Sequence, residues 1–109
     1  MKIDLNITAI ENNLENPQWP LLIAGPCSAE SEEQMVDTAR KLKASKRISF
    51  FRAGIWKPRT RPGMFEGVGE VGLKWMQAVK EETGLPTACE IATPEHAEQA
   101  LKYGIDMLW

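Results

Sequence analysis

The sequence predicts an α/β fold built on a parallel sheet. From Leu21 onward, a short apolar run, a turn containing Gly or Pro and a longer segment with helical spacing follow one another three times, and a fourth apolar run reaches Trp109. Strands that alternate with helices in this way pair in parallel, because each helix carries the chain back across one face of the sheet. The pattern fits either a doubly wound sheet or a closed eightfold barrel. Both need more chain than these 109 residues.

Four strands and three helices are expected between residues 21 and 109. The strands are residues 21–24, 48–52, 87–91 and 105–109. The first helix covers residues 31–44, where Ser31 and Gln34 match a capping box. The second covers residues 66–83 and stops at Gly84. The third has Thr93 as its N-cap and Pro94 at its first position, and it stops before residue 104.

Residues 1–20 are expected to form an extension that precedes the barrel-like part at residues 21–109. The extension is rich in Asn and Pro, as in Asn16-Pro17. Its first half alternates between apolar and polar side chains, with Ile3, Leu5 and Ile7 on one side. This period of two predicts a half-buried strand, or part of a hairpin.

Composition excludes several classes of protein. The chain has 13 basic and 15 acidic residues and a formal charge of −2, which argues against a general nucleic-acid binder. No apolar run approaches the roughly 20 residues that a membrane span needs. The amino terminus has no basic segment followed by an apolar stretch, so a cytoplasmic location is expected. In that reducing compartment, Cys27 and Cys89 are expected to be free thiols.

One segment departs from this acidic balance. Four cations and no acid lie between residues 52 and 61, namely Arg52, Lys57, Arg59 and Arg61. A one-sign cluster favours a small anionic partner such as a phosphate or a carboxylate. Pro58 and Pro62 restrict the backbone around these cations, and Thr60 adds a hydroxyl donor. The alternative interpretation is a solvated loop.

The carboxyl ends of parallel strands collect ligand-binding groups, and three polar side chains are expected there. Cys27 follows the first strand, Arg52 ends the second, and Glu90 lies near the end of the third. A guanidinium in this place holds a carboxylate or phosphate through two parallel hydrogen bonds, whereas the alternative is a surface arginine. Cys27 as a thiolate is a good ligand for a divalent transition metal, although one ligand makes no site. His96 is interpreted as a solvated helix residue.

These motifs resemble one enzyme family. Gly25-Pro26-Cys27-Ser28, the run from Arg52 to Thr60 and the strand with Glu90 resemble 3-deoxy-D-arabino-heptulosonate 7-phosphate (DAHP) synthase across residues 21–109. The Lys-Pro-Arg-Thr quartet at residues 57–60 is the most specific element. The related 3-deoxy-octulosonate 8-phosphate synthases usually carry Ala-Asn-Arg-Ser after that lysine, so the heptulosonate enzyme is favoured. The resemblance implies a (β/α)8 barrel, of which this chain holds three βα units and a fourth strand.

The resemblance also implies an activity, 3-deoxy-7-phosphoheptulonate synthase. This transferase joins phosphoenolpyruvate to erythrose 4-phosphate as the first step of the shikimate pathway towards chorismate and the aromatic amino acids. By resemblance, Cys27 is a ligand of a divalent metal of the Mn, Fe, Co or Zn class, and Arg52 binds phosphoenolpyruvate. Lys57 lies between both substrates and assists proton transfer.

By the same resemblance, Arg59 and Thr60 hold the phosphate of erythrose 4-phosphate, and Glu90 orients the water that adds to phosphoenolpyruvate. The remaining metal ligands, a His, a Glu and an Asp, come from later strands, so the 109 residues alone are expected to be inactive. The family implies homo-oligomers and, in some members, a fused chorismate mutase domain beyond this chain. Two alternatives stay open: an octulosonate synthase, and a phosphate-binding module without catalysis.

Overall fold

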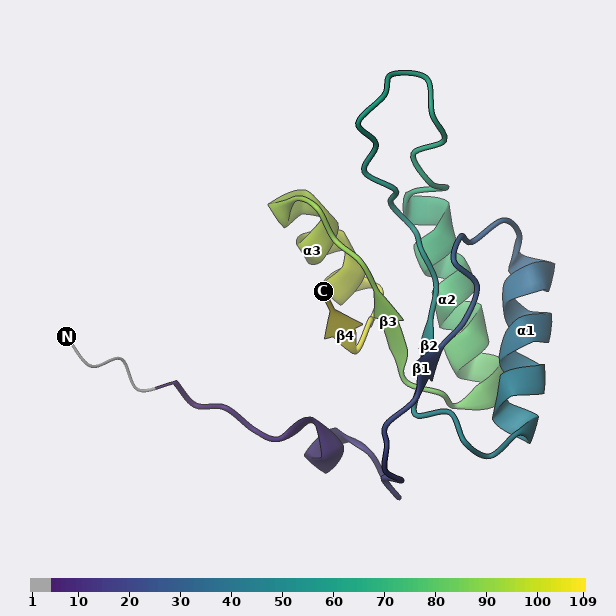
Figure 1. Cartoon of the computed structure of the whole chain (residues 1–109), viewed down its shortest axis with the longest axis vertical. Helices are drawn as coiled ribbons and strands as arrows, with labels where there is room; N and C mark the ends of the chain where they lie inside the picture. Colours follow the sequence, from purple (N-terminus) through teal and green to yellow (C-terminus); the bar gives the residue numbers. More distant parts are fainter. Residues whose placement is uncertain (1–4) are drawn as a thin grey trace.

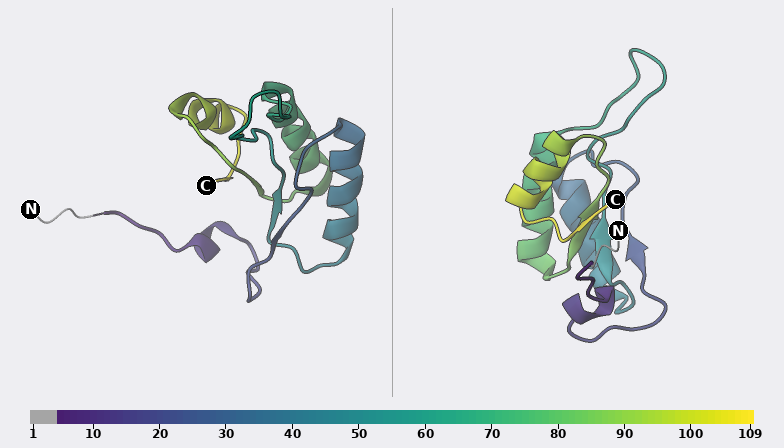
Figure 2. Two further views of the ribbon diagram at one scale, coloured as in Figure 1. Left: turned by 45° about the horizontal axis from the view of Figure 1, so that its top comes forward. Right: turned by 90° about the vertical axis from the view of Figure 1, so that its left-hand side faces the viewer.

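The chain forms one parallel sheet with helices packed on one side of it. The structure is a computed structural model that describes residues 5–109 (Figures 1 and 2). The strands are β1 (Ile23–Ala24), β2 (Phe50–Arg52), β3 (Thr87–Cys89) and β4 (Met107–Leu108). Their spatial order is β1-β2-β3-β4 and every pairing is parallel. The predicted α/β class is confirmed, and the sequential order within these residues matches a barrel rather than a doubly wound sheet, whose strand order reverses.

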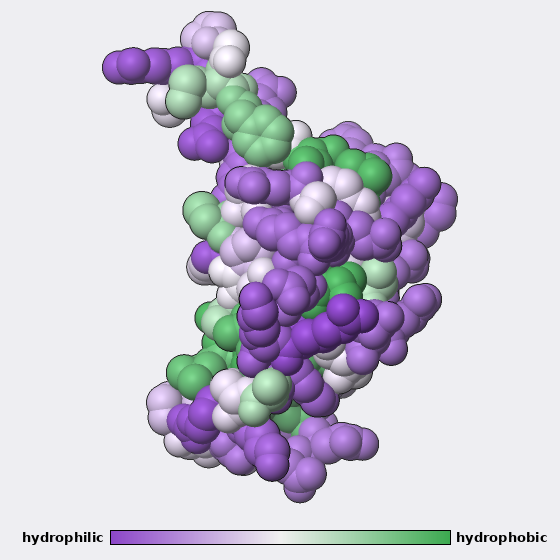
Figure 3. Space-filling model, turned by 90° about the vertical axis from the view of Figure 1, so that its right-hand side faces the viewer, coloured by the Kyte–Doolittle hydropathy of each residue, from purple (hydrophilic) through white to green (hydrophobic). Residues whose placement is uncertain are grey.

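Three helices connect the strands. They are α1 (Glu32–Ala44), α2 (Glu70–Thr83) and α3 (Pro94–Lys102), and a short 3₁₀ helix, η1 (Ile10–Asn13), precedes β1. The core lies between the helices and the sheet, where Phe51 of β2 packs in one cluster with Met35, Leu73 and Met76. Phe50 and Arg52 have the opposite parity, so they belong to the face of the sheet turned away from this cluster. The outer surface of α1 is largely hydrophilic (Figure 3).

The predicted helix boundaries are correct at most ends. Ser31 accepts a hydrogen bond from the backbone N of Gln34 (3.0 Å), and Thr93 caps α3 with Pro94 at its first position. The α2 helix ends at Gly84, which is left-handed with φ 72°. The predicted start of this helix at residue 66 is wrong, because α2 begins at Glu70. Two glycines at positions 67 and 69 have φ of 98° and 72°, and a helix cannot include such residues.

The strands are shorter than the predicted runs. The carbonyl of Leu22 accepts from both Ser49 (2.8 Å) and Phe50 (3.1 Å), which is an irregular contact, and β1 begins one residue later. Backbone bonds nevertheless continue past the last strand residues, as in the bond from the N of Ile91 to the carbonyl of Trp109 (2.9 Å). The apolar runs therefore mark where the sheet lies, while the ladder itself is confined to their central residues.

The extension before β1 differs from the expected strand in the part that the structure describes. Residues 5–9 pair with no strand, and Leu5 and Ile7 are 71% and 78% exposed, because no neighbouring backbone is there to cover them. The first residues of the alternating stretch, Ile3 and Asp4, lie outside the described residues. A domain boundary after residue 20 stays a prediction. From residue 5 to residue 109, no helix has the length and apolar character needed to cross a bilayer.

Candidate functional site

Four of the six predicted site residues lie together where the strands end. The ammonium of Lys57 donates to the carbonyl of Cys27, and its Nζ lies 3.5 Å from the sulfur of the same residue. Arg52 Nη1 is 3.6 Å from Glu90 Oε1 and also approaches the carbonyls of Pro26 (3.4 Å) and Cys27 (3.5 Å). We call Cys27, Arg52, Lys57 and Glu90 the strand-end cluster. The thiol and the cations thus share one edge of the sheet.

Two glycines allow this close approach of the β1 and β2 ends. A Cβ on Gly25 would lie 1.8 Å from the carbonyl oxygen of Arg52. A Cβ on Gly54 would lie 2.2 Å from the carbonyl oxygen of Cys27 and 2.3 Å from Lys57 Nζ. The two loops are also joined by a hydrogen bond from the backbone N of Ala29 to the carbonyl of Gly54 (3.0 Å). The geometry of the cluster therefore requires glycine at position 54, which the sequence analysis did not single out.

The electrostatics of the cluster favour an anion. Two cations face one carboxylate, and the side chains of Arg52 and Glu90 are only 25% and 29% exposed, so water screens them poorly. Glu90 Oε2 and Ser28 Oγ are buried and have no hydrogen-bond partner among the described residues. Buried polar atoms normally have partners, so these two atoms are available to a ligand or to water.

Cys89 lies immediately before Glu90 and has the opposite parity. Burial, together with the charge of Glu90, raises the pKa of Cys89 to about 11. The side chain is fully buried and belongs to the core cluster. It therefore stays a neutral thiol at physiological pH, which is the state of a core residue and not of a metal ligand.

The other two predicted residues, Arg59 and Thr60, lie in a loop that projects beyond the sheet. We call residues 58–66 the basic loop (dark teal in Figure 1). Its base is closed by a bond from the N of Lys57 to the carbonyl of Glu66 (2.7 Å), and Arg59 Nε donates to the carbonyl of Phe65 (2.8 Å). No hydrogen bond or ion pair in residues 5–109 connects Arg59 or Thr60 to the strand-end cluster.

A stacked pair of rings lies beside the basic loop. The ring centroids of Trp56 and His96 are 4.0 Å apart with an interplanar angle of 7°. Both rings line a cleft of about 170 Å³ together with the two cations Lys57 and Arg59. The sequence analysis gave His96 no role, and a single histidine in the first turn of a helix carries no signal that would have predicted this contact.

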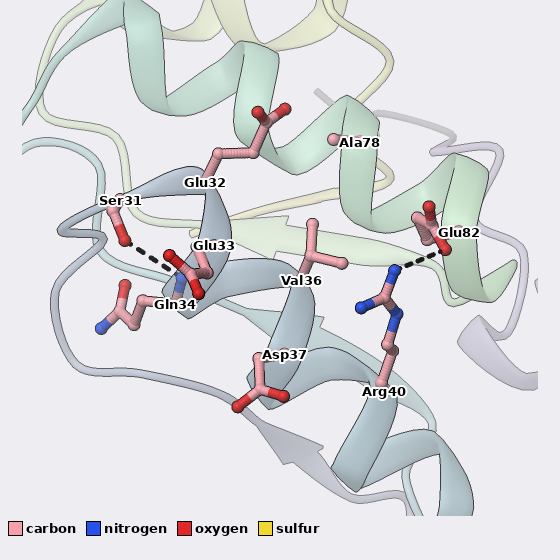
Figure 4. A pocket seen from close by; sticks show the side chains of 9 residues that line it. All are labelled: Ser31, Glu32, Glu33, Gln34, Val36, Asp37, Arg40, Ala78 and Glu82. Carbon is pink, nitrogen blue, oxygen red and sulfur yellow. Dashed lines mark hydrogen bonds and ion pairs between the residues drawn. The ribbon is translucent and has the colours of Figure 1, made fainter.

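The residues present match only part of a metal site. Cys27 is exposed and forms no disulfide, so its thiol suits one ligand of a transition metal. Between residues 5 and 109, however, no group of three His, Cys, Asp or Glu side chains is placed to hold an ion. A larger cleft between α1 and α2 is no alternative site for an anion, because four of its nine lining residues are acidic and its one cation, Arg40, is paired with Glu82 at 3.1 Å (Figure 4). Residues 5–109 by themselves therefore do not provide a complete metal site.

Fold and site together define a class of protein. A parallel sheet in sequential order, with cations gathered at the carboxyl ends of its strands, is the arrangement of part of a (β/α) barrel. The sequence profile described as the DAHP synthetase I family matches residues 11–108. The chain belongs to the DAHP synthetase I family.

Individual relatives agree with this placement. The chain is 33% identical over 82 residues to the phospho-2-dehydro-3-deoxyheptonate aldolase of Thermotoga maritima, which covers 75% of this chain and 24% of that protein. It is 40% identical over 110 residues to the 2-dehydro-3-deoxyphosphooctonate aldolase of Variovorax paradoxus, covering 95% of this chain and 38% of that protein. The chain thus spans about a quarter to two fifths of the length of these relatives.

A solved structure supports the fold. The crystal structure of the phospho-2-dehydro-3-deoxyheptonate aldolase (DAHP synthase) from Thermotoga maritima superposes with a TM-score of 0.71 at 31% identity. The match covers 81% of this chain and 25% of that chain. The four strands and their helices therefore correspond to part of a (β/α)8 barrel, as the sequence predicted.

Proposed function

We propose that this chain supplies the first four strands of the barrel of a 3-deoxy-7-phosphoheptulonate synthase. The observation that carries the proposal is the strand-end cluster, in which Lys57 joins the Cys27 loop to the basic loop that ends at Glu66. In the proposed reaction, C3 of phosphoenolpyruvate attacks the aldehyde carbon of erythrose 4-phosphate, and water adds to C2. The C–O bond to phosphate then breaks, which yields DAHP and inorganic phosphate.

Each residue of the cluster has a proposed task in that reaction. Arg52 binds the carboxylate or phosphate of phosphoenolpyruvate, because its guanidinium is about three quarters shielded from water and can hold such groups through paired hydrogen bonds. Glu90 has one unpartnered oxygen and orients the attacking water. Lys57 lies between the two loops and moves a proton. Its ammonium lies 3.5 Å from the Cys27 sulfur, and the residue lines one cleft with Arg59, so it adjoins both proposed substrate positions.

The basic loop is proposed to hold the second substrate. The side chain of Arg59 lines the cleft next to Lys57, and Thr60 follows with an additional hydroxyl. Both side chains are exposed, so a phosphate reaches them from solvent. A divalent metal, with Cys27 as one ligand and the others from outside this chain, would polarise the aldehyde carbonyl when bound. The 109 residues alone are proposed to lack activity and tight metal binding.

The second candidate is a 3-deoxy-octulosonate 8-phosphate synthase. It is favoured by the Variovorax relative, which has the higher identity over a longer alignment. The two reactions differ in the aldehyde, since an eight-carbon product requires a five-carbon aldose phosphate. The Pro58-Arg59-Thr60 sequence after Lys57 supports the four-carbon substrate, because it is the heptulosonate pattern.

A direct assay tests the proposal. A complete barrel containing this chain is incubated with phosphoenolpyruvate, a divalent metal and either erythrose 4-phosphate or a five-carbon aldose phosphate, and phosphate release is followed. We expect release with the four-carbon aldehyde, and loss of that release with chelator or in Cys27→Ala. Preference for the five-carbon aldehyde would support the octulosonate candidate. Phosphate binding without turnover would instead support a module that lacks catalysis.

A further inference from the structure

The stacked pair Trp56 and His96 connects two loops that are far apart in the sequence. Trp56 lies in the loop after β2, and His96 is the third residue of α3. Parallel rings with centroids 4.0 Å apart make a contact in which neither ring turns freely. The contact therefore ties the loop after β2 to the start of α3.

His96 is held in place by its own surroundings. Its backbone N donates to Thr93 Oγ1 (3.1 Å), which is the N-cap bond of α3. Its ring Nδ1 accepts a hydrogen bond from the backbone N of Ala92 (3.2 Å). With Nδ1 as an acceptor, the ring proton is assigned to Nε2. The two hydrogen bonds, to Ala92 and Thr93, thus hold the ring and the backbone of His96, so the imidazole is a fixed surface against which Trp56 stacks.

Trp56 passes this constraint to the proposed machinery. The next residue is Lys57, whose side chain reaches Cys27 and whose backbone N closes the basic loop on Glu66. Rotation of Trp56 away from His96 would shift the Lys57 backbone and loosen that closure. The same rings line the cleft that Arg59 shares, so the stack also sets the wall against which this guanidinium lies.

We propose that His96 is a positioning residue. By stacking on Trp56, it holds the base of the basic loop so that Arg59 and Lys57 face the same substrate. This inference rests on the proposed function for its kinetic consequences. Its structural consequence, a loop ordered by the stack, is independent of any reaction.

Three variants of His96 distinguish the contribution of the aromatic ring from that of the hydrogen bond to Ala92. His96→Phe keeps a stacking ring and loses the acceptor for Ala92, whereas His96→Asn keeps an acceptor and loses the ring. His96→Ala loses both. They are made in a complete barrel that contains this chain, and amide hydrogen exchange is measured across residues 57–66 together with kcat and the KM of each substrate.

We expect His96→Ala and His96→Asn to exchange about tenfold faster in residues 57–66, as loss of an aromatic pair implies, with α2 and β3 unchanged. The same two variants should raise the KM for erythrose 4-phosphate by a similar factor. The KM for phosphoenolpyruvate, bound at Arg52, should change little. His96→Phe should restore both the exchange and the KM. A merely structural role would instead accelerate exchange throughout the barrel.

Several results would overturn the inference. Unchanged loop exchange in His96→Ala would do so, as would wild-type behaviour of His96→Asn combined with failure of His96→Phe. The two proposals fail separately. If the parent barrel shows no condensation but the loop exchange follows the ring as expected, the function is wrong and the ordering of the loop stands. If the parent barrel is active and amide exchange in residues 57–66 does not depend on the ring at position 96, only the role of His96 is wrong.

Discussion

The strand-end cluster and the basic loop carry similar charges but are held in different ways. In the cluster, Arg52 and Glu90 are about three quarters shielded and rest on strands that pair through backbone hydrogen bonds. In the loop, Arg59 and Thr60 are exposed, and two hydrogen bonds to Phe65 and Glu66 maintain its shape. The cluster is therefore preorganised, whereas the loop must lose conformational freedom when it binds a ligand.

This difference suggests a division of work between the two regions. A preorganised, poorly hydrated guanidinium gives strong interactions with an anion that stays in one place. A loop with exposed cations can bind a substrate that enters later, through the phosphate at the far end of that substrate. Lys57 links the two regions, because its side chain contacts Cys27 and its backbone N closes the basic loop on Glu66. Variants that affect one region without the other test this division.

The largest effect is expected for Lys57→Ala in a complete barrel. Loss of a positioned proton-transfer group lowers rates by roughly 10²- to 10⁴-fold, and we expect kcat to fall by at least about 10²-fold. The assay is phosphate release with both substrates. Lys102→Ala serves as the matched control, because this exposed lysine lies in the last turn of α3. Retention of most activity in Lys57→Ala would remove Lys57 from the mechanism.

Gly54→Ala is expected to lower kcat nearly as much as Lys57→Ala, although it removes no polar group. The new Cβ would lie 2.3 Å from Lys57 Nζ and 2.2 Å from the carbonyl oxygen of Cys27, so the ammonium or the loop has to move. We expect kcat to fall by about 10²-fold, since small displacements at a reacting centre have effects of this size. The measurement is kcat at saturating concentrations of both substrates.

Gly63→Ala is the counterpart in the basic loop. Its Cβ would meet nothing within 4 Å, although its φ of 83° makes any side chain strained. We expect a modest change in the KM for erythrose 4-phosphate and little change in kcat. Equal losses of kcat in Gly54→Ala and Gly63→Ala would show that the two regions do not differ in rigidity.

The helices were the most predictable part of the fold, because their signals are local. Ser31, Thr93 with Pro94, and Gly84 each act within one turn of the helix end, and each lies at the predicted boundary. The late start of α2 was not predicted, because it depends on the backbone conformation at Gly69. Apolar periodicity continues across such a residue and gives no sign of it.

The candidate site was predictable where parity and strand ends determine it. Ligand-binding groups collect at the carboxyl ends of parallel strands, and this rule predicted that Cys27, Arg52 and Glu90 lie close together. The stacking of Trp56 on His96 could not be predicted from the sequence, because it joins two segments whose relative position depends on the packing of the whole sheet. The roles of these residues in catalysis stay predictions.

Arg59→Ala is expected to have a smaller and more selective effect. Removing a charged hydrogen-bond donor from an exposed loop should raise the KM for erythrose 4-phosphate about tenfold, with the KM for phosphoenolpyruvate nearly unchanged. Arg61→Ala is the matched control, since this cation lies two residues away on the same exposed loop. If both KM values rise together, Arg59 acts on the whole site and the proposed division of work is wrong.

The smallest effect concerns Cys89, which lies in the core behind the strand-end cluster. It is measured as the change of the free energy of unfolding with pH. The pKa of Cys89 is raised from 9.0 to about 11 by burial and by the charge of Glu90. Below pH 9 both the folded and unfolded states carry the thiol proton. Between pH 9 and 11 the unfolded state loses it first, so stability falls over this window by about 2 kcal/mol. Denaturant unfolding of a complete barrel at pH 8.5 and pH 11 measures the fall.

Cys89→Ala should reduce that fall, whereas Cys27→Ala should leave it intact, because Cys27 is exposed. The hydrogen bond to Glu70 raises the pKa of Tyr103, but Tyr103 is present in both variants, so its contribution cancels in the comparison. An equal fall in both variants would mean that water reaches the back of β3. The strand-end cluster would then lack the rigid, dry support that distinguishes it from the basic loop.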